Sequence, residues 1–235
     1  MRPYSYLRAG RALAVAGVPT AAVALAALPA IATTPTHAVA PASHHPVAQA
    51  ARAKVSIRHR RLNVVAGRHT TVSGRLVGRG SGHVVLLQRA AAHGRWVTID
   101  RDATNHHGRF RLSSRVSRTG TTMLRVRVRH DRALRASVRS VGHLNVFRTV
   151  SASWYGPGLY GGLLACGGTL GFSTMGVAHR TLPCGTKVAL RYRGRTVRVR
   201  VIDRGPFVAG RDYDLTQATK TALHFGDVGT LLATH

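Results

Sequence analysis

The stretch that decides the fold of the C-terminal part is VALRYRGRTVRVRVIDRGPF, residues 188–207. Apolar residues alternate with basic or polar residues on both sides of Arg193-Gly194, and a period of two is typical of strands with one buried face. Because Arg193-Gly194 is a turn signal, the pattern predicts a β-hairpin of strands 188–192 and 196–201. Asp203-Arg204-Gly205-Pro206 then ends the second strand in a turn.

One short helix is predicted downstream of the hairpin. Asp214 or Thr216 can act as its N-cap, because either side chain can accept a hydrogen bond from an amide of the first turn. The helix is expected to run to about His224, with Gly226 ending it. These features predict a small β domain with one helix.

Short alternating runs also fill residues 55–147, upstream of the hairpin, with glycine, asparagine and histidine between them. The runs are 71–76, 84–88, 96–100, 109–112, 124–129 and 138–146. In the run 124–129 valine alternates with arginine, so valine is expected to face a core and arginine the solvent. Such runs without a helical period predict an antiparallel β-sandwich. In this pattern the segment resembles the immunoglobulin-like modules of secreted bacterial proteins.

The N-terminal residues have the features of an export signal. Three arginines precede an apolar run over 12–32, and Thr36-His37-Ala38 provides a small-residue cleavage site. The alternative is an uncleaved membrane anchor, since 21 residues are long enough to span a bilayer, although two internal prolines make that helix weak. No cysteine lies near the cleavage site, which excludes a bacterial lipid anchor. We therefore expect a secreted or cell-wall-associated protein.

The charge of the chain is strongly positive and unevenly spread. It has 35 Lys and Arg residues against 7 acids, all of them Asp, for a formal net charge of +28. The absence of Glu excludes the zinc-protease helix and the EF-hand loop, and no phosphate-binding glycine pattern occurs. No cofactor or metal is therefore expected.

Residues 51–150 alone carry 22 Lys and Arg and 3 Asp, a net charge of +19. A field of that sign favours a polyanionic partner. In an exported protein the partner is expected to be an anionic wall polymer rather than nucleic acid. The alternative interpretation is an arginine-rich face that is only solvated.

The chain has two cysteines, Cys166 and Cys184. An even number of cysteines in an exported protein predicts a disulfide. The alternative is a cysteine nucleophile served by His179, which requires a free thiol.

Three motifs follow one another in the C-terminal third. They are ASWYGPG at 152–158, GVAHRTLPCGT at 176–186, and VIDRGPFVAGR at 201–211 with YDLT at 213–216. These residues resemble the RlpA (rare lipoprotein A) family over about Ser151 to Thr230. The resemblance implies a six-stranded double-psi β-barrel with one short helix. It also implies lytic cleavage of peptidoglycan glycan strands, which leaves 1,6-anhydro ends.

Together these observations predict an exported all-β protein with four segments. They are a signal peptide at 1–38, a linker at 39–54, a basic immunoglobulin-like β-sandwich at 55–148 and an RlpA-like double-psi β-barrel at 151–235. Peptidoglycan glycan strands are the expected partner of the barrel.

Glycosidic cleavage requires a carboxylic acid that protonates the leaving oxygen, and hydrolysis usually requires a second carboxylate. A lytic reaction requires less, because the 6-hydroxyl of the substrate itself can attack the anomeric carbon. By the resemblance, Asp214 would be the acid, and Asp203 would raise its pKa as a neighbouring negative charge. The alternative is structural: Asp214 caps the helix and Asp203 binds turn amides.

One position departs from the family pattern, because Gly168 stands where the family usually has a glutamate. If that glutamate is essential, the chain binds glycan without cutting it. The second functional hypothesis is therefore a non-catalytic, expansin-like wall-binding or wall-loosening module. Tyr155, His179 and Arg204 are the candidate substrate-binding residues. Trp154 either stacks on a sugar ring through its apolar face or packs in the core.

Overall fold

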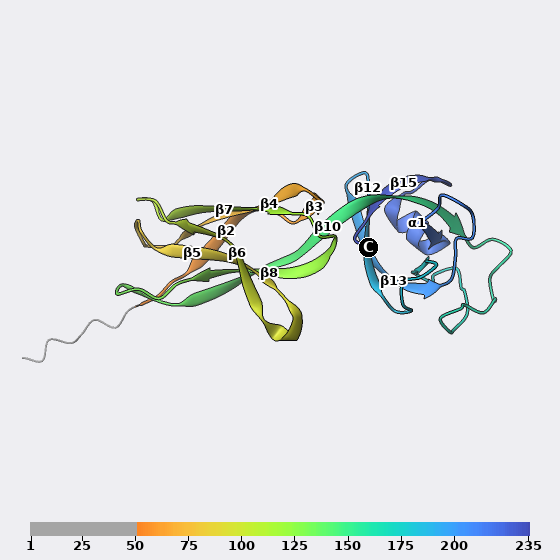
Figure 1. The fold of residues 1–235 in the computed structure, drawn as a ribbon, viewed down its shortest axis with the longest axis horizontal. Helices are drawn as coiled ribbons and strands as arrows, with labels where there is room; N and C mark the ends of the chain where they lie inside the picture. Colours follow the sequence, from red (N-terminus) through yellow and green to blue (C-terminus); the bar gives the residue numbers. More distant parts are fainter. Residues whose placement is uncertain (1–50) are drawn as a thin grey trace, which may run out of the picture. The chain divides into compact units, whose positions relative to one another are not determined.

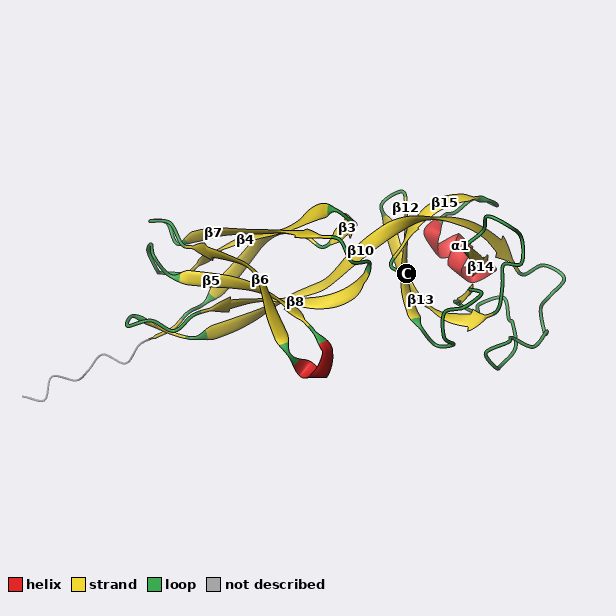
Figure 2. Cartoon of the chain, viewed as in Figure 1, coloured by secondary structure: helices red, strands yellow, loops and turns green. Residues whose placement is uncertain are grey.

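The computed structural model describes residues 51–235. The predicted signal peptide, 1–38, and residues 39–50 of the predicted linker lie outside the described residues. Residues 51–235 are mostly β with one short α-helix, as the sequence predicts (Figures 1 and 2). Within this range no helix is both long enough and apolar enough to cross a membrane.

The N-terminal part of the described chain is a sandwich of two antiparallel sheets. One sheet has the order β2 (Val55–Arg61), β4 (Arg68–Leu76), β7 (Arg109–Val116). The other has the order β10 (Ser137–Tyr155), β8 (Gly120–Val128), β5 (Val84–Ala90), β6 (Trp96–Ala103). Strands β2, β4 and β7, the first, second and fifth of the seven along the chain, thus face β5, β6, β8 and β10. This distribution is immunoglobulin-like.

Shorter elements complete the sandwich. They are β1 (Ala51–Arg52), which pairs with β9 (Leu134–Arg135), β3 (Asn63–Val65), which pairs with β10, and the 3₁₀ turn η1 (Ala92–Gly94). All of them lie at the ends of the longer strands or between them along the chain.

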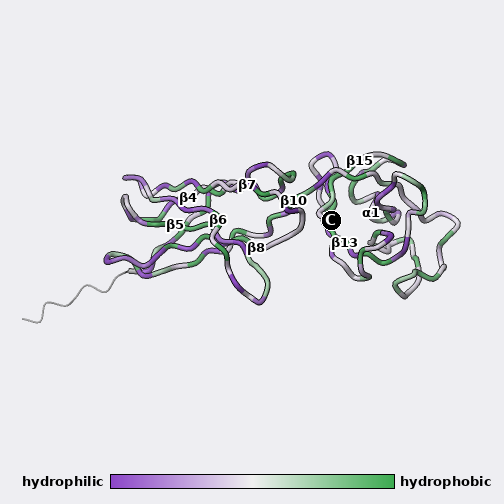
Figure 3. Tube along the Cα trace, viewed as in Figure 1, coloured by the Kyte–Doolittle hydropathy of each residue, from purple (hydrophilic) through white to green (hydrophobic). Residues whose placement is uncertain are grey.

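The core of the sandwich follows the alternation along its strands. On β8 the side chains of Leu124, Val126 and Val128 are buried, whereas Arg127 between them is exposed. They pack with apolar residues of the facing sheet such as Leu112 of β7. The expected arrangement of valine inside and arginine outside is therefore confirmed, and Figure 3 shows the resulting alternation of hydrophobic and hydrophilic positions.

The C-terminal part is a closed six-stranded barrel. It comprises the second half of β10 and β11 (Val177–Ala178), β12 (Lys187–Tyr192), β13 (Arg195–Asp203), β14 (Tyr213–Thr216) and β15 (Gly229–Ala233). The strand order is β14-β11-β13-β12-β15-β10, and the pairing of β10 with β14 closes the ring. Two pairs, β10 with β14 and β11 with β13, are parallel.

The predicted hairpin is confirmed as β12 and β13. Tyr192 pairs with Arg195, so Arg193 and Gly194 form a two-residue turn. Both have positive φ, 43° and 87°. Positive φ at both positions matches the right-handed twist of a hairpin, and glycine adopts it without steric cost.

The predicted helix is α1 (Gln217–Leu223), and the structure decides between its two candidate caps. Thr216 is the N-cap, because its side chain accepts a hydrogen bond from the Thr219 amide. Asp214 lies within strand β14 and does not cap the helix. The prediction that Gly226 ends the helix is wrong, since His224 itself adopts the left-handed conformation with φ 53° and is the C-cap.

We expect Thr216→Ala to destabilise the barrel by about 1–2 kcal/mol, the usual cost of a lost threonine cap. The Thr216 hydroxyl is buried and also accepts a hydrogen bond from the Gly176 amide, so alanine leaves two amides without this partner. Chemical denaturation measures the effect, and Thr216→Ser is the matched control because it keeps the hydroxyl. A Thr216→Ala protein as stable as the parent would contradict the assignment.

Strand β10 belongs to both parts of the structure. Residues 137–146 pair with β8, and residues 148–155 pair with β15 and then β14. Phe147 lies between these two sets of partners, is fully buried and pairs with Val65 of β3. A single continuous strand therefore belongs to a sheet of the sandwich with its first half and to the barrel with its second half (Figure 1).

Candidate functional site

Cross-strand pairing brings the two candidate carboxylates onto one face of the barrel wall. Ala178 of β11 pairs with Asp203 at the end of β13 and also with Asp214 of β14. Side chains of directly paired residues project from the same face. With one strand between them, Asp203 and Asp214 have backbones about 9–10 Å apart.

Asp203, Ala178 and Asp214 thus form a row across three neighbouring strands, which we call the Asp203–Asp214 row. Strand β10 extends this row on the far side of Asp214. Ser153 pairs with Asp214, and its hydroxyl donates a hydrogen bond to Asp214 Oδ1. The Arg211 guanidinium donates in turn to Ser153 Oγ, at 3.1 Å. Ser153 is buried. Asp214 therefore has one oxygen fixed by a buried hydroxyl, which orients the carboxyl group.

Tyr155 lies two residues beyond Ser153 on the same face of β10. Its hydroxyl is buried and faces the Asp203 carboxylate. Burial raises the pKa of Tyr155, and the charge of Asp203, a hydrogen bond to Asp203 and the charge of Asp214 raise it further. Tyr155 is thus a protonated phenol next to both carboxylates.

Asp203 is held by the turn that it begins. Its Oδ1 accepts hydrogen bonds from the amides of Ala165 and Arg204, both at 2.9 Å. The structural role considered for Asp203, binding turn amides, is therefore observed. Both amides donate to Oδ1, and Oδ2 accepts neither of these hydrogen bonds. The bond to Ala165 also ties the loop that contains Cys166 to the end of β13.

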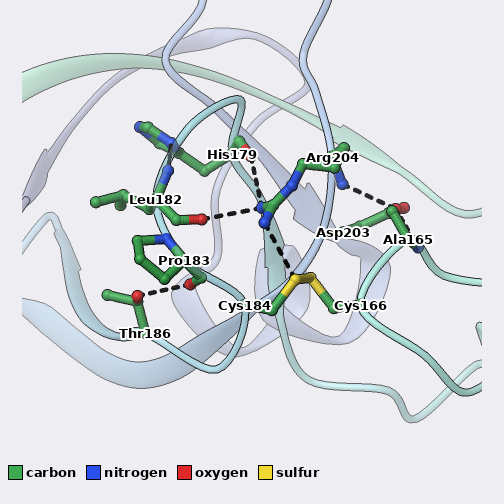
Figure 4. The surroundings of a disulfide bond; sticks show 9 residues. All are labelled: Ala165, Cys166, His179, Leu182, Pro183, Cys184, Thr186, Asp203 and Arg204. Atoms are coloured by element: carbon green, nitrogen blue, oxygen red, sulfur yellow. Dashed lines mark hydrogen bonds between the residues drawn. A yellow bond between two sulfur atoms is a disulfide. The ribbon is translucent and has the colours of Figure 1, made fainter.

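His179 has a defined tautomer. Its Nδ1 accepts hydrogen bonds from the amides of Thr181 and Leu182, at 3.2 and 3.0 Å, so the proton of the neutral ring is on Nε2. Burial lowers the pKa of His179, and the charge of Arg148 lowers it further. Figure 4 shows the His179 ring pointing away from the Asp203 carboxylate. The structure does not bring His179 to the Asp203–Asp214 row.

The Arg204 side chain contacts the protein's own loop. Its Nη1 donates to the carbonyl oxygens of His179 and Leu182, at 3.2 and 2.9 Å, and its Nη2 lies 3.1 Å from Cys184 Sγ (Figure 4). Cys184 forms the predicted disulfide with Cys166, so the cysteine-nucleophile alternative is wrong. Arg204 and the disulfide together fix the loops on both sides of Asp203. The role of Arg204 in substrate binding stays a prediction.

The loop next to Asp203 carries no carboxylate. Gly167 and Gly168 both have positive φ, 92° and 83°. No atom lies within 4 Å of the position that a Cβ at residue 168 would occupy. A side chain at this position would therefore have space, but its backbone conformation would be strained.

Trp154 is held on the opposite face of β10 from Ser153 and Tyr155. Its Nε1 donates to Asp227 at 2.8 Å, and the Lys220 ammonium lies 3.7 Å from the ring centroid. The ring also packs against the barrel core. Of the two roles considered for Trp154, these contacts favour core packing over stacking on a sugar.

Exposed aromatic side chains in the loops that follow β10 and β13 were missed by the sequence reasoning. Phe172 and Phe207 are 73% and 83% exposed, and Phe172 packs its ring 3.9 Å from that of Tyr160. Phe207 follows Asp203 by four residues, beyond the turn that Asp203 begins. Aromatic residues in glycine- and proline-rich loops were the available signal, because such loops bury few side chains. Within residues 51–235 no group of three His, Cys, Asp or Glu residues is arranged to hold a metal ion.

Comparison with known proteins gives a family match over the barrel. A family model described as "Lytic transglycolase" matches residues 148–231. The probable endolytic peptidoglycan transglycosylase RlpA of Synechocystis is 43% identical over 84 residues, which are 34% of this chain and 26% of that protein. The endolytic peptidoglycan transglycosylase RlpA of Campylobacter jejuni is 42% identical over 81 residues, 34% of this chain and 30% of that protein. The chain thus spans between a quarter and a third of the length of these curated relatives.

Solved structures are more distant. The Streptomyces papain inhibitor aligns with 37% of this chain and 92% of its own, with 26% identity and a TM-score of 0.31. A tetra-tandem repeat from the extending region of a large adhesion protein aligns with 77% of this chain and 47% of its own, with 10% identity and a TM-score of 0.31.

Proposed function

We propose, from the premise that the C-terminal part of this chain is an RlpA-like double-psi β-barrel domain, that the barrel cleaves peptidoglycan glycan strands by lytic transglycosylation. The observation that carries the proposal is the row in which Asp203 and Asp214 flank Ala178, with Tyr155 beside them. The row provides two carboxylates and a protonated phenol on one face. The exposed Phe172 and Phe207 can contact the apolar faces of sugar rings.

In the proposed reaction Asp214 is the general acid. Its protonated carboxyl gives a proton to the glycosidic oxygen as the bond from that oxygen to the anomeric carbon breaks. The resulting carboxylate takes the proton of the substrate's 6-hydroxyl as the hydroxyl oxygen bonds to the same carbon. Asp214 ends in its starting form and no water is consumed. Asp203 stabilises the positive charge that develops on the sugar ring.

The alternative function is an expansin-like module that binds or loosens the wall without covalent chemistry. Gly168 favours it, because the loop that donates an amide to Asp203 lacks the glutamate usual in the family. One experiment separates the two: purified protein is incubated with peptidoglycan sacculi, and the soluble products are analysed by mass spectrometry. Ends with 1,6-anhydro sugars support the lytic reaction, reducing ends indicate hydrolysis, and bound protein without products supports the alternative.

We also propose that the protein acts outside the cytoplasm, in the cell envelope, and that residues 55–148 and 151–235 are its two domains. The disulfide is consistent with an oxidising compartment. In this proposal the sandwich attaches the protein to anionic polymers of the wall through its net positive charge.

Attachment through charge predicts a salt-dependent affinity. Binding of the full chain to sacculi is expected to weaken at least tenfold between about 50 and 200 mM salt, because a protein that neutralises several anionic groups releases their counterions. Co-sedimentation at several salt concentrations measures this. Sacculi stripped of anionic polymers are the control and are expected to show weaker, salt-insensitive binding through the barrel. Equal, salt-insensitive binding to both preparations would contradict attachment by the sandwich.

A further inference from the structure

The three acids of the sandwich all bind backbone amides. Asp102 accepts from the Arg111 amide at 2.7 Å and Asp100 from the Ser113 amide at 2.5 Å, so both cover the open edge of strand β7. Asp131 accepts from two amides of its own turn and pairs with His83. Arg135 aside, the sandwich has one arginine that forms an ion pair with a carboxylate in the described part of the chain: Arg148, at its last residue, lies 3.4 Å from Asp212 of the barrel.

The outer face of the β2-β4-β7 sheet places cations next to one another. Arg75 of β4 pairs directly with Arg109 of β7, and His69 pairs with Arg115. Like charges directly opposite one another destabilise a sheet. Alternate residues of β7 lie about 7 Å apart along this face, and three of the four from 109 to 115 are arginine, with Ser113 between Arg111 and Arg115. The face thus has a line of arginines, and none of them forms an ion pair in the described part of the chain.

At one end of this line the surface forms a pocket of about 380 Å³. Its basic lining consists of Arg75, Arg79, Arg109, His106 and His107. These residues come from β4 and β7 and from the loops that follow β4 and precede β7, which lie side by side at the end of the sandwich (Figure 1).

The two loops are fixed at Gly108. Its carbonyl accepts a hydrogen bond from the Leu76 amide at 2.9 Å. A Cβ at residue 108 would lie 2.3 Å from the Arg79 carbonyl oxygen, and φ there is +71°. Only glycine fits such a close approach, so the pocket wall has a defined shape.

One arginine of the pocket has an unpaired donor, and the positive charges around the pocket lie close together. Arg75 Nε is buried and has no hydrogen-bond partner within residues 51–235. Repulsion between the imidazoles of His106 and His107 lowers the pKa of His107, and the charges of Arg109 and Arg75 lower it further. A buried donor without a partner is costly to leave unsatisfied. An anion in the pocket would supply acceptors and opposite charge at the same time.

We propose that this pocket binds a phosphate group of a phosphodiester-linked polyol polymer of the cell envelope, with further phosphates along the arginine line of β7. The inference rests on the proposed attachment of the sandwich to anionic wall polymer and adds the site and the chemistry. Guanidinium groups donate paired hydrogen bonds to phosphate oxygens. The pocket holds one phosphate with its substituents, and the line continues along a single extended chain, which fits a flexible linear polymer.

The test compares two double variants of the full chain with equal loss of charge. Arg79→Gln with Arg109→Gln alters the pocket. Arg101→Gln with Arg127→Gln is the matched control, because these exposed residues flank Leu86 on the other sheet. Affinity for poly(glycerol phosphate) is measured by titration calorimetry at fixed salt, together with the melting temperature. We expect at least a tenfold loss for the pocket variant, less than twofold for the control, and no loss of stability in either.

Equal losses of affinity in the two variants would overturn the pocket as the binding site and would indicate that binding depends only on the net positive charge. No binding of the parent protein to poly(glycerol phosphate) or to sacculi would overturn the attachment proposal itself, and the two failures are therefore distinguishable. Inorganic phosphate followed by NMR is expected to shift the ring signals of His106 and His107 saturably, and unchanged signals would count against the site. Tighter binding of duplex DNA than of poly(glycerol phosphate), lost in the pocket variant, would overturn the polymer in favour of nucleic acid.

Discussion

Asp214→Asn is expected to lower the rate of glycan cleavage by about 10²- to 10⁴-fold, the usual contribution of a general acid. The amide has no proton of suitable acidity, but its oxygen can still accept the hydrogen bond from Ser153. Fold and sacculus binding should therefore remain. Product formation measured by mass spectrometry, beside melting temperature and co-sedimentation, separates loss of chemistry from loss of structure.

Asp227→Asn is the matched control for this prediction. Asp227 belongs to the same barrel but contacts Trp154 and Lys220, on the opposite face of β10. The change is expected to leave cleavage within about twofold of the parental rate. Cleavage at the parental rate by the Asp214→Asn protein would remove Asp214 from the mechanism. A parental protein that binds sacculi and never cuts them would support the binding-module alternative.

Removal of the disulfide is expected to lower the free energy of unfolding of the barrel by about 3 kcal/mol. The disulfide closes a loop in the unfolded chain and so reduces the conformational entropy of the unfolded state. Cys166 and Cys184 are 18 residues apart in sequence. The Cys166→Ala, Cys184→Ala protein should also cut more slowly, because the Ala165 amide that binds Asp203 lies in the loop that is released. Thermal and denaturant unfolding measure the first effect, and sacculus digestion the second.

The parental protein treated with a reductant is the control for this variant and should show the same loss of stability. Thiol titration of the unfolded, non-reduced parent should find no free thiol. Two titratable thiols in that sample, or a melting temperature that does not respond to reductant, would show that the bond does not form in solution.

Local patterns in the sequence were sufficient to predict most of the strands. The β12–β13 hairpin and the alternation on β8 depend on neighbouring residues, which a sequence pattern contains, whereas the helix cap was left open between Asp214 and Thr216 until the structure showed Thr216. The end of the helix was missed because His224 adopts a backbone conformation that the pattern assigned to glycine. A residue other than glycine in the left-handed region is uncommon, so no local pattern indicated that the helix ends at His224.

The composition of the site depends on pairings between distant segments. Asp203, Asp214 and Ser153 share a face because β11 lies between β13 and β14, and because β10 pairs in parallel with β14. No periodicity in the sequence specifies those neighbours. The resemblance to a barrel family provided the two aspartates and Tyr155 as candidates, and the structure adds that Tyr155 lies beside both aspartates and that Ser153 binds Asp214.

The positions of the carboxylates in the sandwich also depend on contacts between distant segments. The sequence indicates a net positive charge but not where the few carboxylates point. Asp100 and Asp102 bind the edge amides of β7 because β6 and β7 approach each other across the two sheets. The sequence therefore could not show that the arginines of the outer face have no acidic partner.

Strand β10 has a consequence for how such a protein can arise and be altered. Modules are usually exchanged at loops, where few hydrogen bonds cross the joint. In β10 the residues that pair with β8 are separated from the residues that pair with β15 by a single residue, Phe147. Phe147 is fully buried. Recombination at this point would divide a paired strand and leave an open sheet edge on each fragment. The sandwich and the barrel are therefore expected to be inherited together, as a pair.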